Sequence, residues 1–187
     1  MNHAVHDASV EHLHTTHPSR AVWPEPLASA KSFATFSDSL PRTEQAVIDA
    51  ALSILGRRLR HPGEAISTPS TVKSYLTLQL SGEQRELFAV LYLDPQHCVI
   101  SFEIPFAGTP TQTSVFPREI VRRALELNAA AVIFSHNHPS GIPTPSSADK
   151  TLTSSMKTAL SMIDVRVLDH IIVAGTSSVS MAEKGLL

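Results

Sequence analysis

Apolar residues recur at helical spacing in some stretches of the chain and form strand-like runs in others, and these stretches define the predicted elements. Residues 1–40 show no sustained periodicity, whereas the next twenty residues carry apolar side chains at helical spacing. A second short helix is predicted from Ser70 to Leu80. The pattern therefore predicts three consecutive parts: a disordered tail at 1–40, a helix with a linker at 41–67 and a folded domain at 68–187.

Within the folded domain, strands are predicted to alternate with helices. The run from Glu86 to Asp94 is almost continuously apolar, as expected for a central strand covered on both faces. The later elements repeat this alternation: strands at 98–104, 130–134 and 165–173, helices at 117–128 and 146–161, and one short strand with a turn within 178–187. Such alternation predicts a layered α/β domain.

A cluster of polar residues follows the strand at 130–134. The chain continues as Ser-His136-Asn-His138-Pro-Ser-Gly, and Ser146 and Asp149 fall in the first turn of the next predicted helix. Alternate side chains of an extended strand point the same way, so both imidazoles can reach one ion. Zinc hydrolases hold the metal with three N or O ligands and keep a fourth position for water. The spacing can supply three such ligands and a polar helper.

Each part of this cluster also has a plainer explanation. A Ser-x-x-acid pair before an apolar stretch is an ordinary capping arrangement, which alone would explain Ser146 and Asp149. The convergence of all four groups on one strand-loop-helix corner favours a site, because α/β proteins place their sites at such strand ends. A hydrolase also needs a proton shuttle. Glu86 is the candidate, and spacing alone does not exclude Glu83 or Glu103.

Composition narrows the classes of function. With 187 residues, of which 42% are hydrophobic and 17% charged, the chain has the makeup of a soluble globular protein. Its 15 basic and 17 acidic residues give no support to nucleic-acid binding. Cys98 is the only cysteine, which excludes an internal disulfide and the thiolate zinc site of nucleobase deaminases. No membrane-spanning run or signal peptide is recognisable, so we expect a cytoplasmic location.

One further pair of polar residues lies in the strand predicted at 165–173. Asp169 and His170 could be taken for additional ligands. Because successive strand residues face opposite sides of a sheet, at most one of them can point to the site. A structural role is therefore favoured for this pair.

Three segments resemble the RadC family of bacterial JAB/MPN-type proteins, which carry the JAMM metalloprotease signature. They are the run from Ser114 to Gly141, the sequence Ser146-Ser-Ala-Asp149, and residues 165–173, and the likeness extends over 68–187. The resemblance implies a three-layer α/β/α JAB/MPN fold with a mixed sheet, related to that of cytidine deaminases. Full-length RadC proteins carry a helix-hairpin-helix module before this domain, and residues 1–40 are too few and too polar to form one.

The resemblance also implies roles for the site residues. His136, His138 and Asp149 would bind zinc, and Glu86 would be the general acid/base, because its strand matches the family's glutamate-bearing strand. Ser146 matches the signature serine and is expected to stabilise the oxyanion. The implied function is hydrolysis of a peptide or isopeptide amide in a peptide or protein substrate. The alternatives are a metal-dependent DNA-processing factor and a non-catalytic MPN scaffold.

Overall fold

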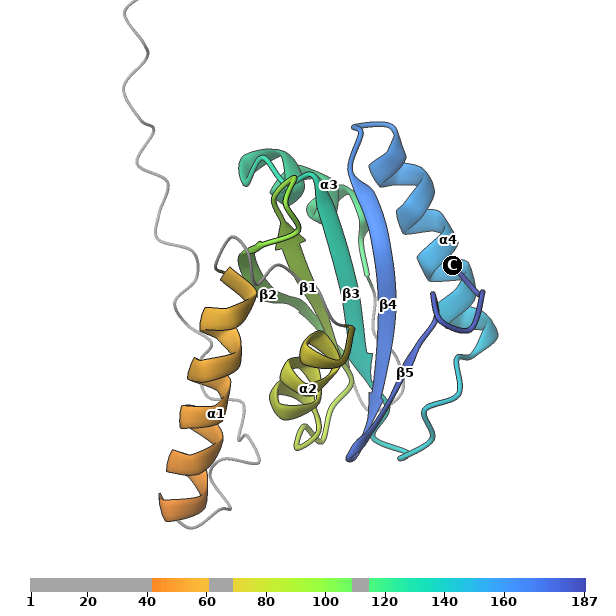
Figure 1. The fold of residues 1–187 in the computed structure, drawn as a ribbon. Coiled ribbons are helices and arrows are strands. Elements are labelled where there is room, and N and C mark those ends of the chain that lie inside the picture. The colour runs from red at the N-terminus through yellow and green to blue at the C-terminus, as the bar shows by residue number, and fades with distance from the viewer. Residues whose placement is uncertain (1–41, 61–68, 109–114) are drawn as a thin grey trace, which may run out of the picture. The chain divides into compact units, whose positions relative to one another are not determined.

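The computed structural model describes residues 42–60, 69–108 and 115–187, so the predicted tail at 1–40 and the linker at 61–67 lie outside the described residues. The elements follow one another as α1 (Arg42–Arg60), α2 (Pro69–Leu80), β1 (Leu87–Leu93), β2 (Val99–Ala107), α3 (Pro117–Glu126), β3 (Ala131–Asn137), α4 (Ser147–Ser161), β4 (Arg166–Ala174) and β5 (Ser177–Ser180) (Figure 1).

The five strands form one mixed sheet in the order β2-β1-β3-β4-β5 (Figure 1). β1 pairs antiparallel with both β2 and β3, β3 pairs parallel with β4, and β4 pairs antiparallel with β5. The parallel pair is joined through α4, as a crossover between parallel strands requires. β1 and β3 are central and buried along their whole length, which explains the continuous apolar run of β1. The predicted α/β class with a mixed sheet is confirmed.

Helices cover both faces of this sheet and enclose two apolar cores. On one face, α1 and α2 contribute Leu59 and Leu76. On the other, α3 and α4 contribute Ile120, Met156 and Leu160. Full burial of each such side chain stabilises the fold by about 1.5–3 kcal/mol. The central strands are therefore packed between helices on both faces, and the side chains at their ends have fixed directions.

The predicted elements match in type, but one differs in length where it matters for the site. The strand expected at 130–134 continues as β3 through Asn137. It does so because His136 pairs with both Phe88 of β1 and Ile172 of β4. His136 and Asn137 are thus strand residues, and only His138 lies in the loop. No helix among the described residues is long and apolar enough to cross a membrane, and the cytoplasmic location stays a prediction.

Candidate metal centre

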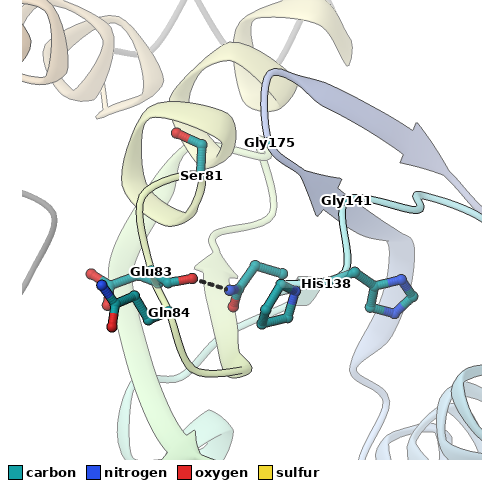
Figure 2. Close-up of a pocket in the computed structure, with 8 residues that line it drawn as sticks. Ser81, Glu83, Gln84, His138, Gly141 and Gly175 are labelled. Carbon is teal, nitrogen blue, oxygen red and sulfur yellow. Dashed lines mark hydrogen bonds between the residues drawn. The ribbon is translucent and has the colours of Figure 1, made fainter. Parts of the chain in front are cut away.

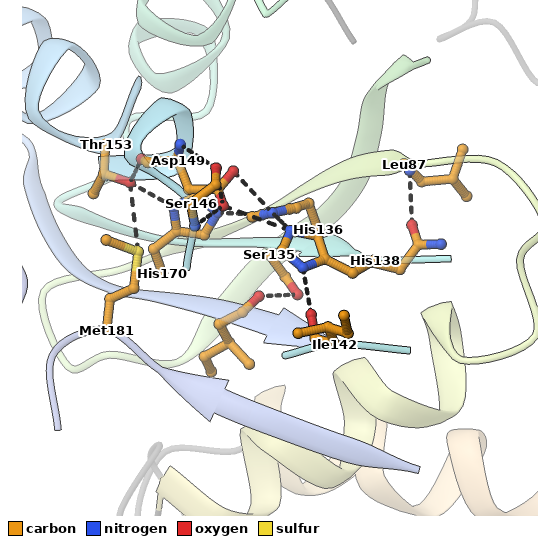
Figure 3. A network of polar contacts seen from close by, with 12 residues as sticks. Leu87, Ser135, His136, His138, Ile142, Ser146, Asp149, Thr153, His170 and Met181 are labelled. Atoms are coloured by element: carbon orange, nitrogen blue, oxygen red, sulfur yellow. Dashed lines mark hydrogen bonds and ion pairs between the residues drawn. The ribbon is translucent and has the colours of Figure 1, made fainter. Parts of the chain in front are cut away.

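His136 lies at the end of a central strand, where pairing on both sides fixes its direction. Its side chain is only 2% exposed. Its Nε2 atom faces His138 and Asp149, and its Nδ1 atom faces His170 (Figure 3). A side chain held this firmly loses little further freedom when it binds an ion, so the strand preorganises this nitrogen.

His138 is oriented by the loop that follows β3. Its main-chain N–H donates to the Val173 carbonyl at 2.7 Å. Its Nδ1 lies 2.7 Å from the Ile142 carbonyl oxygen (Figure 3). Because a carbonyl only accepts, Nδ1 must carry the proton, and Nε2 of the neutral ring keeps a free lone pair. Gly141, with φ of 75°, makes the left-handed turn that brings Ile142 back to the ring.

Asp149 is oriented by the N-cap of α4. The Ser146 hydroxyl accepts from the Asp149 N–H at 3.1 Å, while the Ser146 N–H donates to Asp149 Oδ2 at 2.7 Å. The same hydroxyl donates to Oδ2 at 2.7 Å. Ser146 and Asp149 therefore do form a helix cap, as the capping explanation holds. The cap also occupies Oδ2 and leaves Oδ1 directed at His136, 3.2 Å from its Nε2.

The ligand atoms of the three side chains converge on one point. His136 Nε2 lies 2.9 Å from His138 Nε2, and His138 Nε2 lies 3.5 Å from Asp149 Oδ2. All three groups can place a ligand atom within 4.8 Å of one another. Two ligands on a tetrahedral zinc, each about 2.0–2.1 Å from the ion, stand about 3.3 Å apart. The residues therefore fit a metal ion, and this nitrogen and oxygen donor set also suits other divalent transition metals.

The charges of the cluster also suit a cation. Burial would raise the pKa of the Asp149 carboxyl, but the facing rings of His136 and His138 and the hydrogen bond from Ser146 outweigh it and hold this pKa well below its usual range. The hydrogen bond to Asp149 raises the pKa of His138, burial opposes this rise, and the charge of Glu86 adds to it. The surroundings of Asp149 thus favour its carboxylate form.

Glu86 stands one residue before β1, beside the cluster and outside its three ligands. Since Phe88 pairs antiparallel with His136, the same register continued by two residues leads from Glu86 toward His138. The influence of the Glu86 charge on the pKa of His138 agrees with this placement. The structure therefore brings Glu86 to the edge of the site.

The two competing acids lie in different settings. Glu103 of β2 is engaged by Arg123 of α3, whose Nη2 and Nε lie 2.6 and 2.9 Å from Glu103 Oε1. Glu83 lines a pocket of about 380 Å³ together with His138 and Gly141 (Figure 2). Burial raises the pKa of the Glu83 carboxyl. Glu103 is thus committed to an ion pair, and Glu83 stays the nearer rival of Glu86.

The sequence pattern did not identify Asn137 as a site residue. Its Oδ1 accepts from the Leu87 N–H at 2.7 Å, and its Nδ2 donates to the main-chain oxygens of Glu83 and Arg85 at 3.1 and 2.8 Å. These three bonds fix the segment that carries Glu86. The middle residue of a His-x-His pattern reads as a spacer, because it faces away from the other two, and only the strand pairing reveals its partners.

The sequence offers His170 as a possible further ligand, but its spacing does not reveal the contact with His136. Its Nε2 lies 2.8 Å from His136 Nδ1 (Figure 3). Asp169 instead accepts hydrogen bonds from the Ser180 hydroxyl and the Ala182 N–H, so the prediction that at most one of the pair faces the site is confirmed. Burial lowers the pKa of His170 to about 3, and its ring is therefore neutral.

The chain is similar to known proteins over most of its length. The family model of the RadC-like JAB domain matches residues 66–186. A UPF0758 protein of Polaromonas sp. is 56% identical over 142 residues, which cover 76% of this chain and 63% of that protein. The UPF0758 protein YfjY of Escherichia coli K12 is 49% identical over 148 residues, which cover 79% of this chain and 92% of that protein.

A third relative, a UPF0758 protein of Methylibium petroleiphilum, is 54% identical over 142 residues, which cover 76% of this chain and 64% of that protein. The match thus spans less than two thirds of the Polaromonas and Methylibium relatives. In each comparison it includes most of this chain. By its RadC-like JAB domain, this chain belongs to the RadC family.

Proposed function

We propose that this protein is a zinc-dependent hydrolase of the JAMM type that cleaves a peptide or isopeptide amide bond. The observation that carries the proposal is the convergence of three ligand groups within 4.8 Å, with Glu86 beside them and outside the ligand set. Hydrolytic metal sites combine three protein ligands with a separate acid/base in this way. Membership in the RadC family supports a metallohydrolase as well.

Each residue of the site has one task in the proposed mechanism. His136, His138 and Asp149 would hold the metal, which would act as a Lewis acid, lowering the pKa of water to about 7 and polarising the scissile carbonyl. Glu86 accepts a proton from the attacking water and delivers it to the leaving amine nitrogen. Ser146 donates to the developing oxyanion, a contribution of about 3 kcal/mol in comparable sites. Its hydroxyl must turn away from Asp149 Oδ2 to do so.

A pocket beside His138, which is the one candidate ligand in its lining, suits a substrate with an extended segment. Its volume of about 380 Å³ is enough for a few side chains of a bound peptide, and it opens between the segment at Glu83 and the turn at Gly141 (Figure 2). The main-chain groups of such loops suit hydrogen bonding to another main chain. We therefore assign peptide or protein chains as the substrate class.

The test compares two matched variants of neighbouring acids. Glu86→Gln should retain zinc and lose turnover of an active peptide or isopeptide substrate by about 10²-fold or more, because the proton acceptor is gone. Glu83→Gln should retain both. Metal content is measured by mass spectrometry, and hydrolysis is measured on a panel of peptide and isopeptide amides.

The other outcomes separate the alternatives. A Glu86→Gln variant without zinc would show that Glu86 is a ligand, and equal inactivation by Glu83→Gln would move the base to Glu83. Zinc-loaded protein that leaves the whole panel intact would refute the amide hydrolase. DNA cleavage by the same sample would instead support the DNA-processing factor, and failure to bind any divalent metal would support the scaffold.

A further inference from the structure

We infer that Thr153 and His170, neither of them a ligand, fix the proton arrangement of the metal centre so that His136 presents its Nε2 lone pair to the ion. This inference rests on the metal site of the proposed function. Three short contacts form a continuous chain (Figure 3): His136 Nδ1 to His170 Nε2 at 2.8 Å, His170 Nδ1 to Thr153 Oγ1 at 2.6 Å, and Thr153 Oγ1 to the Asp149 carbonyl oxygen at 2.6 Å.

The direction of every bond in this chain follows from its last member. The Asp149 carbonyl oxygen can only accept, so the Thr153 hydroxyl spends its single proton there. The hydroxyl must then accept from His170, whose Nδ1 carries the proton. A neutral His170 therefore has a bare Nε2, and this nitrogen can only accept from His136 Nδ1. His136 is left with a free lone pair on Nε2.

Burial protects this chain of contacts from water. Thr153, His136 and His170 are each at most 2% exposed, so water cannot replace any member of the chain. The rings of Phe88 and Phe134 stand against His170 with centroids 5.7 and 5.9 Å away. In this apolar enclosure a charged His170 would be costly. It would also donate from both nitrogens and force the proton of His136 onto Nε2, where it would block the metal.

The chain also links the two ends of the ligand set. It starts at His136 on β3, crosses His170 on β4 and ends on the main chain of Asp149 in α4. Ligating histidines usually donate their second N–H to a carboxylate, a carbonyl or water, which fixes both the tautomer and the ring orientation. Here the second N–H of His136 instead reaches a carbonyl through His170 and Thr153, and this carbonyl belongs to Asp149, one helical turn before Thr153. Thr153 and His170 are therefore positioning residues.

The test measures zinc affinity of the apoprotein by competition with a chromophoric chelator at neutral pH. Thr153→Val keeps the side-chain shape and removes the hydroxyl, and His170→Phe keeps the ring and removes both nitrogens. Each should weaken zinc binding about 10- to 100-fold, the usual effect of losing such a partner. Thr158→Val is the matched control, because its exposed hydroxyl also bonds a carbonyl four residues earlier, that of Ser154, and should leave affinity unchanged.

Nitrogen-15 NMR of the histidine rings in the metal-free protein supplies a second readout. The wild type should show His136 protonated on Nδ1, and Thr153→Val should show a mixture of tautomers. Tight zinc binding by both variants with an intact fold, or a His136 protonated on Nε2 in the wild type, would overturn the inference. If a variant fails to fold, the wild-type tautomer decides. A wild type that binds no zinc would refute the proposed function while leaving this tautomer readout decisive.

Discussion

Replacing Asn137 by alanine should loosen the segment that carries Glu86 without removing a metal ligand. The Asn137 side chain is buried and makes three hydrogen bonds, one from the Leu87 N–H and two to the carbonyls of Glu83 and Arg85. Alanine removes both the accepting oxygen and the donating nitrogen of the side-chain amide. The main chain of β3 keeps its pairing with β1 and β4, because those bonds do not involve this side chain.

The size of the effect follows from what the three main-chain groups lose. A buried hydrogen bond contributes about 0.5–1.5 kcal/mol net, and a buried donor left without a partner costs about 1–3 kcal/mol. The Leu87 N–H is such a buried donor, whereas the pocket lined by Asn137 and Glu83 admits water to the freed carbonyls. We therefore expect a loss of about 2–3 kcal/mol in the free energy of unfolding, dominated by the Leu87 amide.

Urea denaturation and amide hydrogen exchange measure this effect. Asn137→Ala should lower the urea midpoint, and exchange at the Leu87 amide should accelerate far more than exchange in the middle of β1. Asn137→Asp serves as a comparison, because it keeps the acceptor for Leu87 but turns a second oxygen toward the carbonyls of Glu83 and Arg85. It should be at least as destabilising. An Asn137→Ala protein within about 0.5 kcal/mol of wild type, with Leu87 still protected, would refute the reasoning.

Four further predictions concern other parts of the site and the elements around it. The pKa of His138 is raised by Asp149, so protons should compete with zinc for this ring. Zinc affinity should therefore fall as the pH drops through the raised pKa. Competition with a chelator from pH 8 to 5.5 measures this fall. In the metal-free protein, the pKa of His138 in the folded state exceeds its value of about 6.5 in the unfolded state. The contribution of His138 to stability should therefore be full below about pH 6.5 and disappear as the pH rises through the folded-state pKa. Urea unfolding with a chelator present measures this dependence. Gly141→Ala should cost about 1–2 kcal/mol in urea, from backbone strain alone, because φ is 75° and no atom lies within 4 Å of the added carbon. Arg123→Ala should cost about 1–2 kcal/mol by breaking its part-buried bonds to Glu103, and zinc affinity should not change.

Features that depend on neighbours in sequence were predictable. The strand, the turn and the capped helix that carry the ligands lie within residues 131–161, and their order brings His136, His138 and Asp149 to one corner. The pattern erred at the end of the strand, where Ser135, His136 and Asn137 look too polar to be buried. They are buried because each finds a partner from another strand or segment, such as the Ile171 carbonyl that accepts from the Ser135 hydroxyl at 2.7 Å.

Features that depend on strand pairing were not predictable. Asn137 bonds Leu87, which is 50 positions away in the chain, and His136 meets His170, which is 34 positions away. No spacing rule connects such pairs, because a shift of one residue in strand register would turn every side chain to the opposite face. The choice between Glu86 and its rivals had the same origin. The register of β1 against β3 supports Glu86, and the ion pair of Glu103 removes one rival, but spacing supplies neither fact and Glu83 stays a rival.

In the proposed proton arrangement both histidines of the candidate centre carry the proton on Nδ1, but different neighbours hold it there. His138 lies in a loop and donates directly to a carbonyl four residues later, so the local sequence is enough to orient it. His136 lies inside the sheet, where its own strand offers the ring no carbonyl, and it depends on His170 and Thr153. If the proposed arrangement holds, a chain with every signature residue intact should still bind the metal more weakly when either of these two residues is lost. Conversely, the capping pair at α4 is insufficient evidence for a site unless a histidine like His136 is held against its carboxylate.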